Sequence, residues 1–468
     1  MNKNKLKELA AMTPARPSYF RRPHWTRRNF FRVMGAGVTA SFLAREADAQ
    51  AAGTCTSQGM TTINKAQNVI FILMAGAPSH VDTFDFKNTT GVTPAAAAPE
   101  TINNMLWPTG IFPKLGALAN QFSIVRSVQA HALVHSLGQT WVQIGRNPAA
   151  SLGNIAPNIG SIVALEKAPE RVPGHVLPTF LALNSDGAVS SGYLDATYAP
   201  FKVDPSTAGL PNTTNTLGQT RWQEMYNQMH TEDDVLRVNS PFGQSVVDMD
   251  SLYGSATGLM YNPTVQSIFT YSSADSTRYG GSSFGNSLIV AKQALAANQG
   301  TRFIQVTIGG WDMHVDIYGA AQNKNGTNIF SLGKQFDSGL AALISDLQAD
   351  GLLDSTMIVA LGEFGRTPTF TAALGRDHYL NQFAFFAGGG VQGGRIIGAT
   401  DATGANITDN GWSQNRAVNP EDIEATIYSA MGIDWTTICY NDPFHRGFEF
   451  VPQNLGPDYY NPINELFS

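Results

Sequence analysis

Continuous runs of apolar residues indicate the strands of a buried sheet. The longest runs are NVIFILMA at 68–75, FIQVTI at 303–308 and TMIVAL at 356–361. Runs of this kind are typical of parallel strands, because a strand covered by helices on both faces needs apolar side chains on both. Further strands are expected at 122–128, 179–183, 383–386 and 395–397.

Between these strands the apolar residues recur with a helical period. The stretch near 330–350 places its apolar residues on one stripe, and Asn419 followed by Pro420 is a favourable helix start. Strands that alternate with helices predict an α/β fold with a mainly parallel sheet. Further helices are expected at 135–146, 157–168, 285–299 and 420–431, with a short helix or turn near 111–119.

Two stretches lack these patterns. Residues 88–110 are rich in Thr, Ala, Pro and Asn and read as a loop, whereas 185–280 is rich in Ser, Thr, Asn, Asp and Gly. We therefore expect residues 50–468 to form a single domain with an insertion or cap region around 185–280.

The charge is distributed unevenly along the chain. The 468 residues have a net charge of −6, but residues 1–49 alone carry ten Lys or Arg and only three Asp or Glu. Within them, Arg27 and Arg28 match the twin-arginine export pattern, followed by an apolar stretch and the small-residue triplet at 47–49. We expect 1–49 to be a signal peptide read by the twin-arginine translocase, which places the mature protein in the periplasm or outside the cell.

The mature protein is markedly acidic, which argues against nucleic acid as a partner. No later segment reaches the roughly 18 apolar residues of a membrane span, so none is expected in the mature protein. In an oxidising compartment Cys55 and Cys439 could pair or remain as two thiols, and their spacing does not suggest a metal site.

Polar residues follow the predicted strands where ligands bind in such sheets, at the carboxyl ends. Asp82 lies after the first strand, Asp312 and His314 follow the second, and Glu363 and Arg366 follow the third. A further loop carries Arg376, Asp377 and His378. Carboxylates and imidazoles together suit zinc or manganese, whereas carboxylate-rich sets suit calcium or magnesium, and the sequence leaves the metal open.

The motifs NVIFILMAGAPSHVDTFDFK, GGWDMH, GEFGRTP, GRDHY and GGGVQGGRIIGATD resemble those of the domain of unknown function 1501 family, in the same order over about 65–405. That family consists largely of exported bacterial proteins in the sulfatase-like branch of the alkaline phosphatase superfamily. The resemblance implies an alkaline-phosphatase-like three-layer α/β/α core. It also implies metal-dependent hydrolysis of phosphate or sulfate esters as the usual chemistry of the superfamily.

Carried over by position, the resemblance implies a divalent-metal set of Asp82, Asp312, His314, Glu363 and His378, with Asp316 as an alternative to His314. The segment from His135 to Pro148 is similar in layout to the sulfatase signature, and His135 falls on the nucleophile position. No cysteine is present there, so a formylglycine mechanism is not expected. Ser136 could attack if His135 or a metal activated it, and Arg366 could steady the anion; alternatively, His135 is a metal ligand and hydrolysis has been lost.

Two functions follow from this sequence. The first is an exported metal-dependent hydrolase that acts on a small anionic ester or glycan through His135, Ser136 and Arg366. The second is a non-catalytic secreted binding protein that retains the fold, which the missing aspartate at the end of the first strand and the absent Cys or Thr nucleophile favour. A third alternative without either function is a purely structural member whose polar loops are hydrogen-bonded turns.

Overall fold

The computed structural model describes residues 55–185, 189–237, 243–319, 327–453, 456 and 459–468. The expected signal peptide at 1–49 lies outside these residues. The centre of the fold is an eight-stranded sheet with the order β13-β5-β12-β9-β2-β8-β6-β7. β12 pairs antiparallel with both of its neighbours, and all the other pairs are parallel. The predicted α/β fold with a mainly parallel sheet is confirmed.

The predicted strands lie in this sheet with small shifts at their ends. The runs at 303–308 and 356–361 are strands over the whole of their predicted lengths, because both are buried at every residue. The strands are β2 (Asn68–Met74), β5 (Phe122–Gln129), β6 (Phe180–Leu183), β7 (Phe201–Val203), β8 (Phe303–Ile308), β9 (Thr356–Leu361), β12 (Asn381–Ala387) and β13 (Arg395–Ile397).

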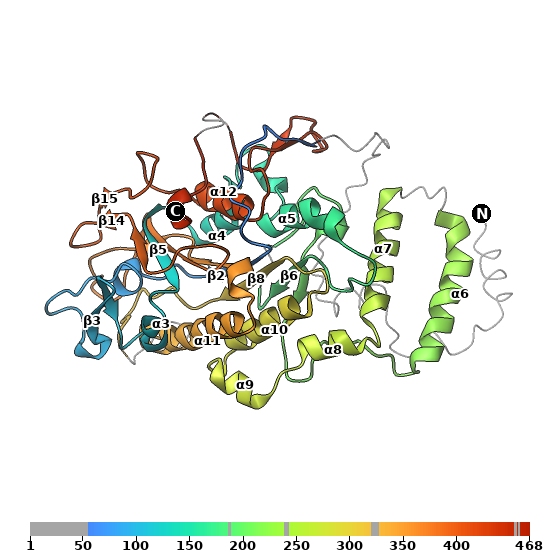
Figure 1. Ribbon diagram of the computed structural model, residues 1–468, viewed down its shortest axis with the longest axis horizontal. Helices are drawn as coiled ribbons and strands as arrows, with labels where there is room; N and C mark the ends of the chain where they lie inside the picture. The colour runs from blue at the N-terminus through green and yellow to red at the C-terminus, as the bar shows by residue number, and fades with distance from the viewer. Residues whose placement is uncertain (1–54, 186–188, 238–242, 320–326, 454–455, 457–458) are drawn as a thin grey trace, which may run out of the picture.

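Helices cover both faces of the sheet (Figure 1). Alternate residues of β2 belong to opposite cores, with Ile70 and Ile72 in one and Val69 and Phe71 in the other. The first core includes α3 (Pro113–Ala117), α10 (Ser283–Ala297) and α11 (Ile329–Ala349). The second includes α4 (His135–Ile144), α5 (Ile159–Lys167) and α12 (Pro420–Ala430). The architecture is therefore three layers, α/β/α.

The stretch at 88–110 is not only a loop. It contains a hairpin of β3 (Pro99–Ile102) and β4 (Met105–Pro108), and Trp107 of β4 is completely buried. Asn103 and Asn104 connect the strands with φ angles of 48° and 60°, the left-handed conformation that tight hairpin turns need and that asparagine tolerates. This Asn-Asn pair indicates a hairpin turn, which the overall composition of the stretch does not reveal.

The stretch at 185–280 is mostly helical where it is described. It contains α6 (Gln219–Arg237), α7 (Gln244–Leu259), α8 (Pro263–Phe269) and α9 (Ser273–Arg278). In Figure 1, α6 and α7 stand at one end of the molecule, beyond the sheet. The same stretch also supplies β7, the edge strand beside β6, so part of it belongs to the central sheet.

The two cysteines form a disulfide. Cys55 lies in β1 (Cys55–Thr56) and Cys439 in β16 (Ile438–Cys439), and the two short strands pair antiparallel. The bond joins positions that are 384 residues apart in sequence. It therefore ties the start of the described chain to the region beyond α12.

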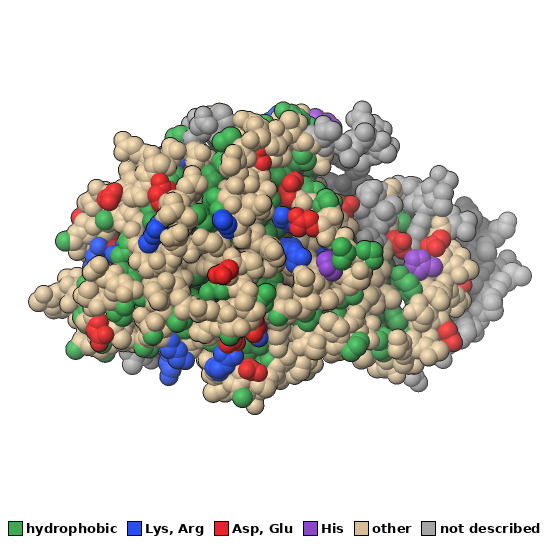
Figure 2. All heavy atoms as spheres, viewed as in Figure 1, with side chains coloured by type: hydrophobic (Ala, Val, Ile, Leu, Met, Phe, Trp, Pro, Cys, Tyr) green, Lys and Arg blue, Asp and Glu red, His purple; other side chains and the backbone are tan. Residues whose placement is uncertain are grey.

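The surface agrees with the low charge content of the sequence. Charged residues make up 14% of the chain, and on the face shown in Figure 2 they are scattered rather than gathered in one field. Among the described residues, no helix combines the length and the apolar character that crossing a membrane requires.

The disulfide predicts a dependence of stability on redox conditions. Because the link restricts a very long loop in the unfolded chain, reduction should lower the free energy of unfolding by about 2–5 kcal/mol. Denaturant titration with and without reductant measures the difference. Cys55→Ser should show the lower stability in both conditions, and an unchanged wild-type curve in reductant would contradict the prediction.

Candidate metal centre

The loops that follow the neighbouring parallel strands β8, β2 and β9 lie at the same edge of the sheet. β2 lies between β8 and β9, and the registers place Met74 opposite Ile308 and Leu73 opposite Leu361. Parallel strands that end together bring the residues after them into contact. Gly76, Asp312 and Glu363 therefore come from three distant parts of the chain to one place.

Four side chains form a compact cluster at this edge. One potential ligand atom from each of His135, Asp312, His314 and His378 lies within 4.8 Å of the other three. Asp312 Oδ1 is 2.9 Å from His314 Nε2, 3.2 Å from His135 Nε2 and 3.9 Å from His378 Nε2. The side chains of Asp312 and His314 are 42% and 40% exposed, so the cluster is open to solvent.

Each imidazole in the cluster is held through its other nitrogen. Nδ1 of His135 lies 2.7 Å from Glu363 Oε1, and Nδ1 of His314 lies 2.9 Å from Asp377 Oδ1. Nδ1 of His378 lies 2.7 Å from the carbonyl oxygen of Leu133. Because these oxygens accept hydrogen bonds, each Nδ1 carries the proton and each Nε2 presents a lone pair to the cluster. This arrangement is the usual support of metal-binding histidines.

The converging nitrogens are only partly supplied with proton donors: in the described part of the chain, a guanidinium N–H of Arg366 lies 3.2 Å from His314 Nε2. His135 Nε2 is buried without a hydrogen-bond partner in the described part of the chain, although Asp312 Oδ1 is close by. His314 Nε2 and His378 Nε2 lie 3.2 Å apart. A cation among these atoms would satisfy them. Three nitrogens and one carboxylate oxygen fit zinc better than calcium or magnesium, which prefer oxygen ligands.

Glu363 lies behind His135 rather than among the converging atoms. Its Oε1 accepts hydrogen bonds from His135 Nδ1, from the backbone N–H of Gly76 at 2.9 Å and from Gln139 Nε2 at 3.0 Å. The hydrogen bond to Glu363 raises the pKa of His135 above its usual value, although burial opposes the shift. Glu363 therefore orients His135.

Helix α4 approaches Glu363 closely because residue 138 is glycine. A Cβ on Gly138 would lie only 3.0 Å from Glu363 Cβ. This close contact places the start of α4, including His135, next to Glu363 after the end of β9. Ser136 follows in the first turn and is exposed.

Arg366 is buried at the back of the cluster, in β10 (Gly365–Arg366). Its guanidinium donates to Asp312 Oδ1 at 2.6 Å, to the Ala77 carbonyl at 2.9 Å and to the Gly76 carbonyl at 2.5 Å. Nη1 of Arg366 also lies 3.2 Å from His314 Nε2. Burial alone would raise the pKa of Asp312, but the hydrogen bond and the charge of Arg366 lower it below its usual value. Asp312 is therefore held as a carboxylate.

The cluster also favours a neutral ring at His378. Burial disfavours the charged form of this imidazole and lowers its pKa. A neutral imidazole is the form that binds a metal ion.

The structure does not bring Asp82 into the cluster. Its carboxylate accepts hydrogen bonds from Nε and Nη2 of Arg376 at 2.6 and 2.9 Å, and from the Tyr318 hydroxyl at 2.6 Å. The side chains of Asp82 and Arg376 are 1% and 4% exposed, so this is a buried ion pair. Because Arg376 precedes Asp377 and His378, the pair fixes the loop that carries both.

Sequence reasoning missed three supporting groups. They are the carboxylate of Asp377, the amide of Gln139 and the carbonyl of Leu133. Asp377 was visible beside His378, but its partner is His314 from a different loop. A backbone carbonyl carries no signal in the sequence at all.

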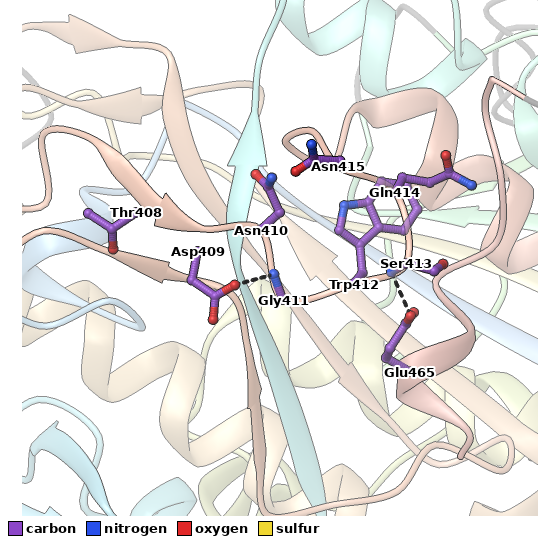
Figure 3. Close-up of a pocket in the computed structure, with 9 residues that line it drawn as sticks. All are labelled: Thr408, Asp409, Asn410, Gly411, Trp412, Ser413, Gln414, Asn415 and Glu465. Carbon is purple, nitrogen blue, oxygen red and sulfur yellow. Dashed lines mark hydrogen bonds between the residues drawn. The ribbon is translucent and has the colours of Figure 1, made fainter.

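A separate polar hollow of about 580 Å³ is lined by residues 408–415 and Glu465 (Figure 3). Two hydrogen bonds hold its wall, from Gly411 N to Asp409 Oδ1 at 2.9 Å and from Ser413 N to Glu465 Oε1 at 2.7 Å. None of its lining residues belongs to the four-residue cluster. The cluster, not this hollow, carries the candidate chemistry.

Comparisons with known proteins give a family and distant structural similarity. The model of a family described as "Protein of unknown function (DUF1501)" matches residues 66–449. No curated protein matches the chain significantly. Among solved structures, a sulfatase from Pseudoalteromonas sp. is 13% identical with a TM-score of 0.39, and the match covers 79% of this chain and 68% of that one.

Two further similar structures have names of related kinds. A phosphonate monoester hydrolase from Silicibacter pomeroyi is 12% identical with a TM-score of 0.37, over 86% of this chain and 76% of its own. A protein in the alkaline phosphatase superfamily from Vibrio parahaemolyticus is 10% identical with a TM-score of 0.34, over 88% and 76%. TM-scores this low carry no argument about activity, so the function has to be argued from the cluster itself.

The surroundings of Asp82 predict a loss of stability rather than a direct loss of a ligand. Asp82→Asn removes the charge that balances buried Arg376, so the free energy of unfolding should fall by about 3–5 kcal/mol. Denaturant titration measures the fall, and exposed Asp354→Asn is the control that should change little. A variant of unchanged stability that no longer binds metal would instead identify Asp82 as a ligand.

Proposed function

The chain belongs to the DUF1501 family of unknown function, and we propose that it is an exported metal-dependent hydrolase of phosphate or sulfate esters. The observation that carries the proposal is the convergence of three imidazoles and one carboxylate, each imidazole supported through its outer nitrogen. Structural ion pairs do not need three lone pairs directed at one point. A site for a divalent cation does.

The residues that would hold the metal are His135, Asp312, His314 and His378, and zinc is the ion that their atoms suit best. A bound divalent cation supplies positive charge that polarises an ester oxygen. Glu363 and Asp377 keep two of the rings in place. Arg366 keeps Asp312 ionised and aimed at the cluster.

The charge balance explains why anion binding should depend on the metal. Asp312, Glu363 and Asp377 bring three carboxylates, against the single guanidinium of Arg366. An anionic ester would be repelled by this set alone, and unit charges a few ångströms apart interact by several kcal/mol in a partly buried site. A divalent cation bound in the cluster would attract the anionic ester and so offset this repulsion.

We assign Ser136 as the nucleophile of the proposed reaction. It is exposed in the first turn of α4, directly after His135, where the unpaired N–H groups of a helix start favour a negative charge. Its Oγ would form a bond to phosphorus or sulfur and give its proton to solvent, while the bond to the ester oxygen breaks and that oxygen takes up a proton from solvent to leave as the alcohol. Water would then hydrolyse the serine ester, which releases phosphate or sulfate and restores the hydroxyl. Because Nδ1 of His135 is held by Glu363 and its Nε2 faces the other cluster atoms, His135 acts as a ligand in this scheme and not as a base for Ser136.

The second candidate is a secreted binding protein that keeps the metal without turnover. The observation that favours it is that the Ser136 hydroxyl has no hydrogen bond to a base among the described residues. Export is part of both proposals. The twin-arginine pattern supports it, and so does the disulfide, because such bonds persist in oxidising compartments.

The central experiment measures metal content and turnover of the mature protein, residues 50–468. Wild type should bind a divalent ion and hydrolyse at least one ester in a panel of phosphomonoesters, phosphodiesters and sulfate esters. His378→Ala and Asp312→Ala should lose most of the metal, and Ser136→Ala should keep the metal and lose turnover. Metal at the wild-type level in both ligand variants would refute the site, and bound metal without any turnover would favour the binding protein.

The support of His314 by Asp377 predicts a graded effect on metal affinity. Asp377→Asn keeps the size of the side chain but weakens its hold on His314, so metal affinity should fall about 10- to 100-fold. Competition with a chelator of known affinity measures the change. Asp204→Asn, an exposed aspartate elsewhere in the chain, is the matched control and should leave the affinity unchanged.

A further inference from the structure

Exposed aliphatic side chains adjoin the metal cluster. Ten large hydrophobic residues in the described part of the chain are substantially exposed, and half of them lie beside cluster residues in sequence or through backbone contacts. We call these five the rim: Leu133, Val134, Val315, Leu374 and Leu380. Single exposed hydrophobic residues need no explanation, but a gathering of them around one site marks a binding surface.

Leu133, Val134 and Leu380 adjoin His135 and His378. The Leu133 carbonyl accepts from His378 Nδ1, and Val134 directly precedes His135. Leu380 follows His378 by two residues, and its carbonyl accepts from Ala130 N at 2.9 Å, so the two segments run together. Val134 is the most exposed of the rim residues, at 59%.

The other side of the rim adjoins His314. Val315 follows His314 and forms a backbone bridge with Leu374. The next residue, Gly375, packs so tightly on this segment that a Cβ there would lie 2.0 Å from the His314 carbonyl carbon. Val315 and Leu374 are 44% and 58% exposed. The two parts of the rim therefore flank the same group of histidines.

Leu374 adopts a backbone conformation that does not suit it. Its φ angle is +60°, in the left-handed region where glycine is unstrained and a leucine costs about 1 kcal/mol or more. Its side chain is also largely in water, so packing does not offset that cost. A ligand that covers the side chain would offset it.

We propose that the rim binds the apolar part of the ester, so that the substrate is an amphiphilic monoester with an anionic head and an alkyl or aryl group. This inference rests on the proposed function, because the head is placed by the metal cluster. The rim is entirely aliphatic, whereas sugars are recognised by side chains that offer hydrogen bonds and aromatic faces. The rim thus favours an apolar alcohol over a glycan as the group that leaves.

The test uses alkyl phosphonates of one, four and eight carbons, which resemble the head and tail but are not hydrolysed. Titration calorimetry on the zinc-loaded mature protein gives their dissociation constants below the micelle-forming concentration. Each methylene that the rim covers should tighten binding about two- to fourfold, and the heat-capacity change should become more negative with length. Alkyl sulfonates of the same lengths distinguish a sulfate-like head from a phosphate-like one.

Two variants each remove one rim side chain and suit the local backbone. Leu374→Gly removes the side chain and suits the left-handed backbone, and Val134→Ser places a favourable residue at the start of α4. In each variant, the increase in affinity from the one-carbon to the eight-carbon phosphonate should be at least tenfold smaller than in the wild type. Binding of methylphosphonate should be unchanged. Leu217→Ser and Val172→Ser, which replace residues 58% and 55% exposed away from the rim, should keep the full gain.

The outcomes separate this inference from the proposed function. Binding of methylphosphonate tests the metal cluster. The ratio of the dissociation constants of the one-carbon and eight-carbon phosphonates tests the rim. Equal affinities at all lengths would overturn the rim proposal and leave the hydrolase proposal intact. A length dependence that survives removal of the metal, with no binding of the short probe, would support the rim and overturn the cluster as an anion site. If no probe binds, both are wrong.

Discussion

The parallel pairing of β2 with β8 and β9 is the constraint on which the site depends. Each of these strands is buried on both faces, so a slip of one residue would move every side chain into the wrong core. The register is therefore strongly specified, and the strand ends stay level. The hydrogen bond from Gly76 to Glu363 and the contacts of Arg366 with Gly76 and Asp312 all follow from that alignment.

A second constraint is electrostatic. Residues 50–468 are acidic and the candidate site is acidic too, yet the proposed substrate is an anion. Two arginines could have resolved this conflict, but Arg376 is committed to Asp82 in a buried ion pair. Arg366 is itself buried and occupied by Asp312 and backbone carbonyls. A cation held by the cluster is the remaining source of positive charge among the described residues of the site.

Much of the fold and part of the site were readable in the sequence. The apolar runs at 303–308 and 356–361 matched their strands fully, because complete burial makes such runs unambiguous. Asp312 and His314 were found because residues after parallel strands gather at one edge, whereas His378 came from the family resemblance. Asp82 and Glu363 satisfied the same rule, yet one faces Arg376 and the other supports His135. Position along a chain does not say in which direction a side chain points.

The sequence by itself determined the layers, the order of burial along the strands and the edge of the sheet where polar residues collect. These properties depend on apolar periodicity and on local turn chemistry, which are written in consecutive residues. Only the tertiary structure decided which nitrogen of each histidine faces the cluster, that the two cysteines pair, and that exposed aliphatic side chains adjoin the cluster. The physical reason is that each of these depends on contacts between segments tens to hundreds of residues apart, and those contacts exist only once the sheet has brought the strand ends together.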